Sequence, residues 1–233
     1  MPLAGGIGLE RLKAIAQLVK PGQPVADIGA DHALLAIYLI NKKIAPRVIA
    51  IELGEGPYQR LRKAVESSPY ADSILVRKGD GLQPLEPGEA YSVVMAGMGG
   101  DTMVQVLGND WDKASSFARF VLQPMSRPAA LRLALAQQGW QLVNETLVRQ
   151  NRYFYSIIVA VPGTHPYNLS PLELDAGPIL LRQTGAVAQA YREHLRGKYQ
   201  RMHSSLLRSK TSHARLLLKE VEDKLKELEV YWP

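Results

Sequence analysis

Residues 25–40, VADIGADHALLAIYLI, place a short apolar run, a glycine turn and an apolar helical pattern in immediate succession. This order is typical of the first strand, turn and helix of a nucleotide-binding α/β domain. The turn nevertheless lacks the GxGxxG pattern that lets bare backbone approach a pyrophosphate, because Asp31 and Leu34 stand where its second and third glycines would be. Asp27 and Asp31 would repel a pyrophosphate, so the turn predicts a ligand that carries positive charge.

The alternation of strand-length apolar runs with helical patterns continues through the first two thirds of the chain. Val, Ile and Leu runs separated by helices indicate a mostly parallel sheet that is covered on both faces. The last two runs leave no room for a helix between them, which predicts a terminal antiparallel β-hairpin. We expect strands at 25–30, 47–53, 73–79, 91–98, 119–124, 140–148 and 153–161, and helices at 9–20, 31–42, 57–67, 101–107 and 128–138.

Five βα units followed by a hairpin are the layout of a seven-stranded, Rossmann-like class I methyltransferase domain. A dehydrogenase sheet would require one more crossover helix. We therefore expect this α/β domain at 1–163 and a connecting segment, rich in turn residues, at 164–183.

The remaining residues, 184–233, form a helical tail in this interpretation. Apolar residues recur at alternating steps of three and four from Ala188 to Leu206, and again from Ala214 to Leu228, with the polar residues 208–213 between them. Two heptad-like helices with a short polar link predict an antiparallel coiled-coil hairpin, and a single long helix is the alternative. The oligomeric state stays open, because a heptad face can pair within one chain or between chains.

The tail has an uneven distribution of charge. The chain as a whole carries a formal charge of +6, whereas the residues from Glu220 onward hold five acids and two lysines. Such a basic block is a plausible contact surface for a polyanion, although a solvated helix face would look the same. Between Arg182 and Lys219 there is one acid, Glu193, and nine basic residues: Arg182, Arg192, Arg196, Lys198, Arg201, Arg208, Lys210, Arg215 and Lys219.

Composition limits the remaining possibilities. The 233 residues include no cysteine, which excludes disulfides, thiolate metal sites and cysteine nucleophiles. The five histidines are scattered, so we expect no metal site. There is no apolar run long enough to span a bilayer, and the first twenty residues lack the features of a signal peptide. We expect a soluble cytoplasmic protein with no membrane partner.

The carboxyl ends of the predicted strands hold the residues suited to bind a ligand, because ligands of open parallel sheets bind at that edge. Glu52 ends the second strand, where a carboxylate can accept hydrogen bonds from both hydroxyl groups of a ribose. Asp80 follows the third strand and is suited to accept from an adenine amino group. S-adenosylmethionine carries a sulfonium and an ammonium, so the acids of the first turn favour it over NAD. The expected cofactor-binding residues are Asp27, Gly29, His32, Glu52, Leu53, Asp80, Gly81, Ala96 and Gly97.

These residues also have purely structural interpretations. Asp31 suits the N-cap of the following helix, with His32 at the first helical position as an orienting hydrogen-bond partner. Asp27 could hold the turn through backbone amides, and Asp80-Gly81 alone is only a turn signal. The segment AGMGG, 96–100, could be a tight turn without a ligand.

Several segments together resemble one family of RNA-modifying enzymes: ADIGADHALLAIYL, AIELGEGPY, RKGDGL, VMAGMGGDTM, VLQPM and DAGPILL. They are similar to the bacterial tRNA (adenine-N1)-methyltransferases that modify position 22, and the resemblance runs from about Gly8 to the tail. It implies a Rossmann-like domain with a coiled-coil hairpin, S-adenosylmethionine as methyl donor with S-adenosylhomocysteine as product, and tRNA as partner. It assigns the catalytic role to Asp31. Met125 departs from the pattern, because the resemblance leads us to expect Asn there.

The resemblance agrees with the chemistry of the turn. Adenine N1 has a free lone pair, so no proton must leave before attack, and a fixed carboxylate beside the ring would stabilise the positive charge that the ring acquires. The small residues after the fourth strand predict a slot for an extruded base. The tyrosines of the last strand, Tyr153 and Tyr155, are candidate RNA contacts, although both could instead serve packing. The expected RNA or base contacts are Met98, Gly99, Gly100, Gln123, Arg127, Tyr153, Arg192, Arg196 and Arg201.

Two other function classes are compatible with the sequence. One is a class I methyltransferase that acts on another acceptor, such as rRNA, a protein or a small molecule. The other is a non-catalytic RNA-binding module that has kept a cofactor-binding fold. The methylated atom and the tRNA position follow from the resemblance alone.

Overall fold

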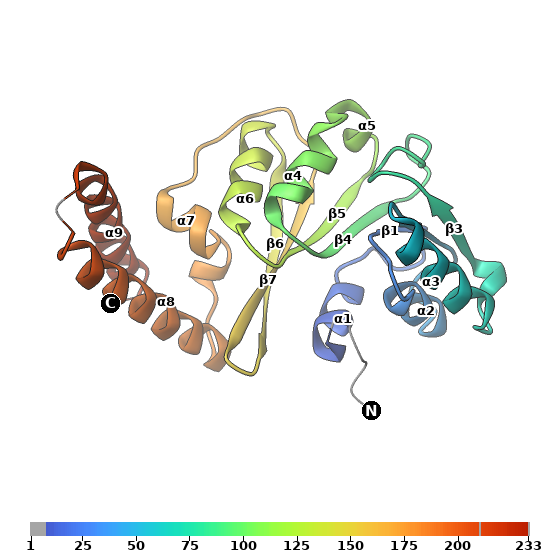
Figure 1. Ribbon diagram of the computed structural model, residues 1–233, viewed down its shortest axis with the longest axis horizontal. Helices are drawn as coiled ribbons and strands as arrows, with labels where there is room; N and C mark the ends of the chain where they lie inside the picture. The colour runs from blue at the N-terminus through green and yellow to red at the C-terminus, as the bar shows by residue number, and fades with distance from the viewer. Residues whose placement is uncertain (1–7, 210, 233) are drawn as a thin grey trace. The chain divides into compact units, whose positions relative to one another are not determined.

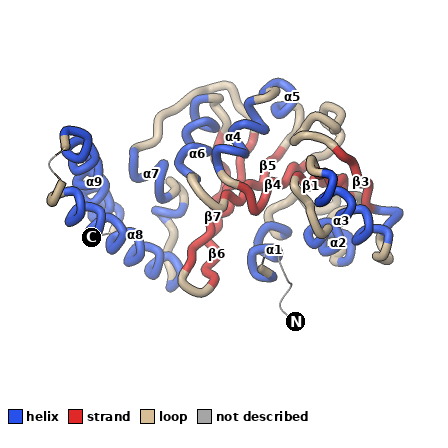
Figure 2. The backbone as a smooth tube through the Cα atoms, viewed as in Figure 1, coloured by secondary structure: helices blue, strands red, loops and turns tan. Residues whose placement is uncertain are grey.

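A computed structural model describes residues 8–209 and 211–232 of the chain (Figures 1 and 2). It divides into two compact units, one up to Tyr167 and one from Asn168. Residues 164–183, which we expected to form a connection, are therefore shared between the units, and they include a short helix. No helix in the described ranges is both long and apolar enough to cross a membrane.

The first unit is built on one seven-stranded sheet of order β3-β2-β1-β4-β5-β7-β6. The first five strands run parallel, and β7 lies antiparallel between β5 and β6. This confirms the predicted mostly parallel sheet with a terminal hairpin. The strands are β1 (Val25–Ile28), β2 (Val48–Glu52), β3 (Ile74–Lys78), β4 (Ser92–Met98), β5 (Arg119–Pro124), β6 (Gln141–Gln150) and β7 (Tyr153–Val161).

Helices cover both faces of the sheet, as the apolar runs predicted. One core joins α4, α5 and α6 to inward residues such as Ile28 and Ile51, and the other joins α1, α2 and α3 to residues such as Val25 and Val94. Because side chains alternate along a strand, Asp27 faces the same side as Val25, toward α1 and α2. The helices are α1 (Leu9–Ala16), α2 (Leu34–Asn41), α3 (Glu55–Glu66), α4 (Gly100–Gly108), α5 (Trp111–Ser115) and α6 (Pro128–Gln137).

Two details of the predicted layout are wrong. The expected number of five βα units is too high by one, because the fully described connection from β3 to β4, residues 79–91, contains no helix, in agreement with the predicted helix positions but not with that number. Helix α5 was not expected, and it is only five residues long. The Asp110 side chain caps it by accepting from the Lys113 amide at 2.9 Å.

The second unit consists of α7 (Pro171–Ala176), the short 3-10 helix η2 (Leu180–Arg182), α8 (Ala186–Leu206) and α9 (Ser212–Tyr231). Helices α8 and α9 pack against each other, and their contacts run in opposite chain directions. Arg192 lies over the Trp232 ring, while His203 lies 3.3 Å from Glu222. This confirms the predicted antiparallel helical hairpin and excludes the single long helix. Thr211 caps the start of α9, because its side-chain oxygen accepts from the Ala214 amide.

Candidate active site

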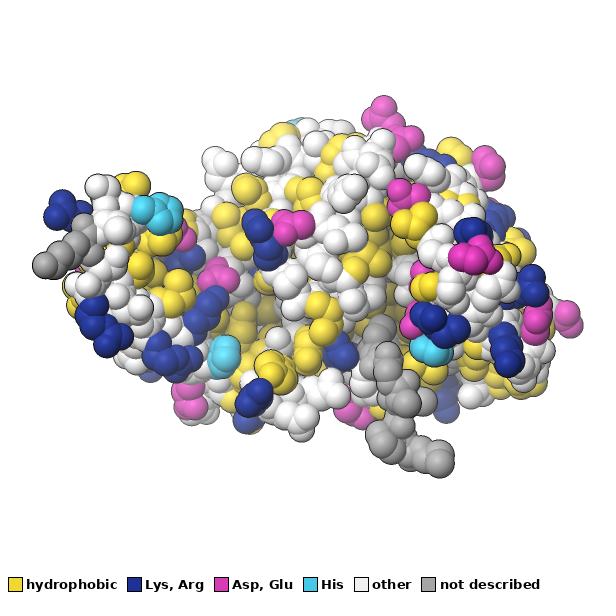
Figure 3. All heavy atoms as spheres, viewed as in Figure 1, with side chains coloured by type: hydrophobic (Ala, Val, Ile, Leu, Met, Phe, Trp, Pro, Cys, Tyr) yellow, Lys and Arg dark blue, Asp and Glu magenta, His cyan; other side chains and the backbone are white. Residues whose placement is uncertain are grey.

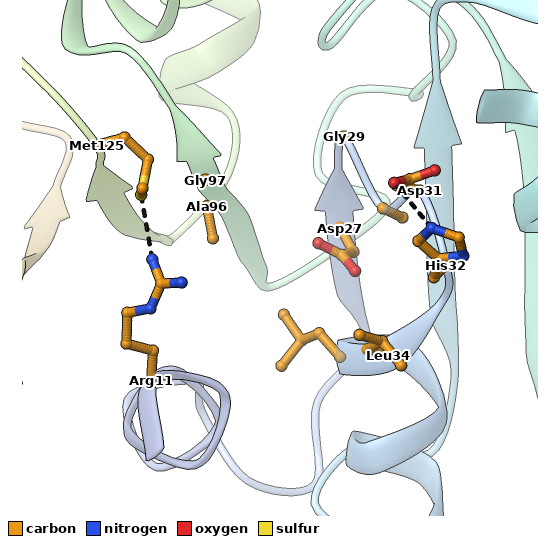
Figure 4. A pocket seen from close by; sticks show the side chains of 11 residues that line it. Arg11, Asp27, Gly29, Asp31, His32, Leu34, Ala96, Gly97 and Met125 are labelled. Carbon is orange, nitrogen blue, oxygen red and sulfur yellow. Dashed lines mark hydrogen bonds and ion pairs between the residues drawn. The ribbon is translucent and has the colours of Figure 1, made fainter. Parts of the chain in front are cut away.

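A cavity of about 290 Å³ opens at the carboxyl ends of β1 and β4 (Figure 4). These two strands are neighbours, but the chain leaves β1 toward β2 on one side and continues from β4 to β5 on the other. The cavity therefore lies at the topological switch point, where open α/β sheets bind their ligands. Its walls are formed by Arg11, Asp27, Gly29, Ala30, Asp31, His32, Leu34, Leu35, Ala96, Gly97 and Met125.

The turn after β1 has an unusual backbone. Gly29, Asp31 and Ala33 all have positive φ angles, of 78°, 35° and 56°. Helix α2 starts only at Leu34 and has Ala33, not Asp31, at its N-cap. The interpretation of Asp31 as a helix cap is therefore wrong, and His32 precedes the helix instead of starting it.

Asp31 instead joins the turn to two neighbouring elements. Its amide donates to the Glu52 carboxylate at the end of β2, with 2.7 Å between Asp31 N and Glu52 Oε1. Its own carboxylate accepts from the Arg60 guanidinium of α3 at 2.9 Å, and His32 Nε2 lies 3.3 Å from its other oxygen. Figure 4 shows the Asp31 carboxylate turned toward His32 at the rim of the cavity.

Asp27 provides the buried carboxylate of the cavity, and only 5% of its surface is exposed. The described residues form no ion pair with it. Burial raises the pKa of Asp27 to about 7, and the nearby negative charge of Glu52 contributes to the rise. The site therefore holds a carboxyl group that ionises near neutral pH and has no positive charge of its own beside it.

Arg11 of α1 faces the two acids from the opposite wall of the cavity (Figure 4). It is 7% exposed, and its guanidinium donates to Gln123 Oε1 at 3.4 Å and to Met125 Sδ at 3.1 Å. Its Nε is buried and finds no hydrogen-bond partner among the described residues. Arg11 was not among the residues predicted for the site. A signal was available, because Arg11 lies one helical turn before the buried Ile15.

The glycines after β4 serve different purposes. Gly97 has a φ of 82°, and a methyl group there would meet no described atom within 4 Å, so its surface is open. A methyl group at Gly100 would lie 2.3 Å from the Arg127 carbonyl oxygen, and one at Gly99 3.2 Å from Ser126 Oγ. Of the segment 96–100, only Ala96 and Gly97 therefore line the cavity. Met98, Gly99 and Gly100 do not line the cavity, and Gly100 is needed for close backbone packing.

The other expected cofactor residues lie along the same edge of the sheet but outside this cavity. Glu52 is linked to it through the Asp31 amide, and Leu53 next to it is exposed. Asp80 lines a separate depression of about 280 Å³ beside α4 and α5. Gly81 has a φ of 53°, and a methyl group there would lie 2.6 Å from Val106.

Known proteins share the sequence and the architecture of this chain. A family model described as a methyltransferase domain matches residues 9–158. The Bacillus subtilis tRNA (adenine(22)-N(1))-methyltransferase is 32% identical over 182 residues, which cover 76% of each chain. The chain belongs to the family of this methyltransferase.

Solved structures agree over nearly the whole chain. The crystal structure of the B. subtilis m1A22 tRNA methyltransferase has a TM-score of 0.84 and 28% identity, and the match covers 96% of this chain and 98% of that one. A Streptococcus pneumoniae relative in complex with S-adenosyl-L-methionine has a TM-score of 0.81 and 28% identity, with 96% and 99% covered. This chain thus shares both the sheet domain and the helical tail with members of the methyltransferase family.

The base contacts expected in the methyltransferase domain differ in accessibility. Gln123 is fully buried, and its amide donates to the Pro124 carbonyl at 3.0 Å, so its side chain supports Arg11 and is not presented to a ligand. Arg127 is exposed beside Asp101, with 3.1 Å between Nε and Oδ2. Tyr153, at the start of β7, is also exposed.

The basic residues of the tail divide into two groups. Three are used within the second unit: Arg192 donates to the Gln183 carbonyl and lies over Trp232, Arg182 donates to Pro178, and Lys198 pairs with Asp175. Lys210 lies outside the described residues. Figure 3 shows basic side chains on the visible face of this unit. The exposed ones along α8, α9 and the turn are Arg196, Arg201, Arg208, Arg215 and Lys219.

Replacing Asp27 by Asn is expected to stabilise the ligand-free protein at pH 8 but not at pH 4. The folded-state pKa of about 7 lies above the ordinary value of 3.8, so protonation of Asp27 favours folding below pH 4 and this contribution disappears as the pH rises through 7. The variant cannot ionise, so its advantage over wild type grows between these two pKa values, by about 1.4 kcal/mol per pH unit. Chemical unfolding at both pH values measures it.

Asp72→Asn, at an exposed position, is the matched control and should change the unfolding free energy at neither pH. An Asp27→Asn variant whose relative stability is the same at pH 4 and pH 8 would contradict the assignment of a protonated, buried carboxyl group.

Proposed function

We propose that this protein transfers a methyl group from S-adenosylmethionine to N1 of adenine in tRNA, at position 22. The observation that supports this most strongly is the cavity at the switch point, with Asp27 and Asp31 on one wall and Arg11 on the other. The identity to the B. subtilis tRNA (adenine(22)-N(1))-methyltransferase supports the choice of acceptor.

The charges of the cavity are complementary to the amino-acid end of S-adenosylmethionine, which carries an ammonium and a carboxylate. Asp27 is a buried carboxylate without an ion-pair partner among the described residues, and Arg11 has a buried Nε without an acceptor there. In this proposal Asp27 holds the ammonium and Arg11 the carboxylate, while Gly29, His32, Ala96 and Gly97 let the ligand lie against backbone. Glu52, Leu53, Asp80 and Gly81 hold the nucleoside end.

Arg60 has a defined part in this arrangement. It holds the Asp31 carboxylate at the cavity rim through two nitrogens, each 2.9 Å from Oδ1. This ion pair holds the Asp31 carboxylate close to the cavity, and we assign Arg60 as its positioning residue.

When bound, S-adenosylmethionine supplies an electrophilic methyl group. Adenine N1 carries a lone pair, so the protein needs no base to remove a proton. Its tasks are to align the adenine ring and to exclude water. Asp31 is the proposed catalytic residue, because a carboxylate at the rim can accept from the exocyclic amino group and stabilise the positive charge that the ring acquires.

The RNA contacts follow from exposure. Arg127 is suited to a phosphate near the cavity, and Met98, Gly99 and Gly100 form the backbone beside the base slot. In the second unit the exposed Arg196 and Arg201 are suited to phosphates. Arg192 contributes indirectly in this proposal, by holding Trp232 against α8.

The proposal is tested by incubating the protein with S-adenosylmethionine and unmodified tRNA, followed by mass analysis of the nucleosides. The expected product is 1-methyladenosine, and a tRNA with guanosine in place of adenosine 22 should stay unmethylated. A different methylated nucleoside, or equal methylation of both tRNAs, would refute the assignment.

Asp31→Asn is expected to lower kcat by a factor of at least about 100 while it changes the affinity for S-adenosylmethionine by less than about threefold, because only charge that develops on the base is affected. Arg60→Gln should give a smaller loss of kcat, since the carboxylate remains. Single-turnover rates and calorimetry separate the two effects.

Arg62→Gln on the same helix is the control, because Arg62 pairs with Glu66 of its own helix. Equal losses in turnover and cofactor affinity for Asp31→Asn would show that this residue binds the cofactor or shapes the turn.

Reversing two tail charges, Arg196→Glu with Arg201→Glu, should raise the KM for tRNA about tenfold or more and flatten its salt dependence, because phosphate contacts are lost. Binding of S-adenosylmethionine should not change. The double variant Arg62→Glu with Lys63→Glu is the control, because it changes the net charge by the same amount but lies in the first unit. A tail variant that equals wild type in KM and in salt dependence would remove the tail from the RNA contact surface.

A further inference from the structure

The β6–β7 hairpin carries its turn past the edge of the sheet on which the cavity lies. Leu122 of β5 pairs with Ile158 of β7, and β5 ends at Pro124. Because β7 is antiparallel to β5, its first residues, from Tyr153, extend beyond the carboxyl end of β5. Figure 1 shows β6 and β7 continuing as a two-stranded ribbon. Asn151, in the left-handed region with a φ of 56°, forms the turn.

One face of this hairpin connects directly to the cavity through a series of rings and guanidinium groups. Arg11, on the cavity wall, lies 4.2 Å from the centre of the Tyr155 ring. The centres of the Tyr155 and Tyr153 rings are 6.4 Å apart. The two side chains lie on the same face of β7, because residues two positions apart on a strand point the same way. Arg152 lies over the Tyr153 ring at 5.0 Å and donates to its hydroxyl at 2.8 Å.

The exposure of these side chains is not explained by packing. Tyr153 leaves 51% of its surface exposed at the tip, and Arg152 is exposed beside it. Residues 148–155, VRQNRYFY, contain two arginines and no acid. The second arginine, Arg149, lies over Phe154 at 5.6 Å. An ordinary solvated turn carries charges of both signs. This tip instead carries only positive charge and holds a half-exposed aromatic ring in a fixed position.

Rings interleaved with guanidinium groups match the chemistry of single-stranded nucleic acid. Each base offers a face for stacking on an aromatic side chain, and each phosphate offers an acceptor to an arginine. The hydrogen bond and the cation–π contact from Arg152 hold the Tyr153 ring before any ligand arrives, which lowers the entropic cost of stacking.

We propose that Tyr153, Tyr155 and Arg152, here named the hairpin track, bind the nucleotide that adjoins the target adenosine in the same RNA strand. Tyr153 stacks on its base, Arg152 binds its phosphate, and Tyr155 links this position to the cavity through Arg11. The inference builds on the proposed tRNA methylation and adds a second RNA contact, in the catalytic unit itself, to the one assigned to the tail.

Kinetics with full-length variants test the track. Tyr153→Ala should lower kcat/KM for tRNA about tenfold, within the range of roughly 5 to 150 that loss of one stacked base gives. Tyr153→Phe should restore most of it, because the ring and its cation–π contact remain while the hydrogen bond from Arg152 is lost. Arg152→Gln should raise KM. Affinity for S-adenosylmethionine should be unchanged in all three. Tyr91→Ala is the matched control, since Tyr91 is also partly exposed but precedes β4, at the opposite edge of the sheet.

A direct readout of stacking uses tRNA with 2-aminopurine beside adenosine 22, on either side. Binding of wild type should quench the fluorescence at one of the two positions, and Tyr153→Ala should abolish the quenching while Tyr91→Ala keeps it. Wild-type kcat/KM in Tyr153→Ala, or unchanged quenching, overturns the track and leaves the methylation proposal standing. Absence of 1-methyladenosine with wild type refutes the proposed function instead, and the quenching still decides whether the tip binds RNA.

Discussion

The site depends on one unfavourable arrangement, the burial of the Asp27 carboxyl group beside Glu52 without a cation. Burial and the neighbouring negative charge both oppose its ionisation, which is why its pKa rises to about 7. The protein thus maintains, at the switch point of its sheet, a carboxyl group whose charged form needs a positive ligand. A pyrophosphate would worsen the repulsion, whereas a cationic ligand relieves it. We therefore propose that the selectivity between nucleotide cofactors begins with Asp27.

The surrounding turn keeps this arrangement in place at a further energetic cost. Asp31 and Ala33 adopt positive φ angles, which are unfavourable for residues other than glycine. The turn is held from outside, because Glu52 accepts from the Asp31 amide and Arg60 binds the Asp31 carboxylate. Strain that is stabilised by neighbouring elements is a frequent property of functional sites, where it fixes side chains before the ligand binds. The strained turn thus lowers the folding stability of the protein, and in return its side chains are already in place when the ligand binds.

The sequence was sufficient to predict all seven strands. The inner strands β1, β2, β4 and β5 carry apolar runs that are buried along most of their length, whereas the edge strands β3 and β6 are partly exposed and were recognised by length and composition. The sequence was insufficient where distant residues decide. Asp31 has the local preference of a helix cap, yet Arg60, 29 positions away, binds its carboxylate. Arg11 was missed because a buried arginine needs partners, and Gln123 and Met125 lie 112 and 114 positions away. Helix α5 was missed since five residues with one buried side chain, Ala114, leave no periodic pattern.

The most direct test of the account is calorimetric titration of the wild-type protein with S-adenosylmethionine at pH 6, in two buffers that differ in ionisation enthalpy. Asp27 is mostly protonated at this pH and must ionise when it meets the ligand's ammonium, so we expect the release of most of one proton per ligand bound, and none in Asp27→Asn. Tight binding without proton release, or equally tight binding of NADH, would contradict the account.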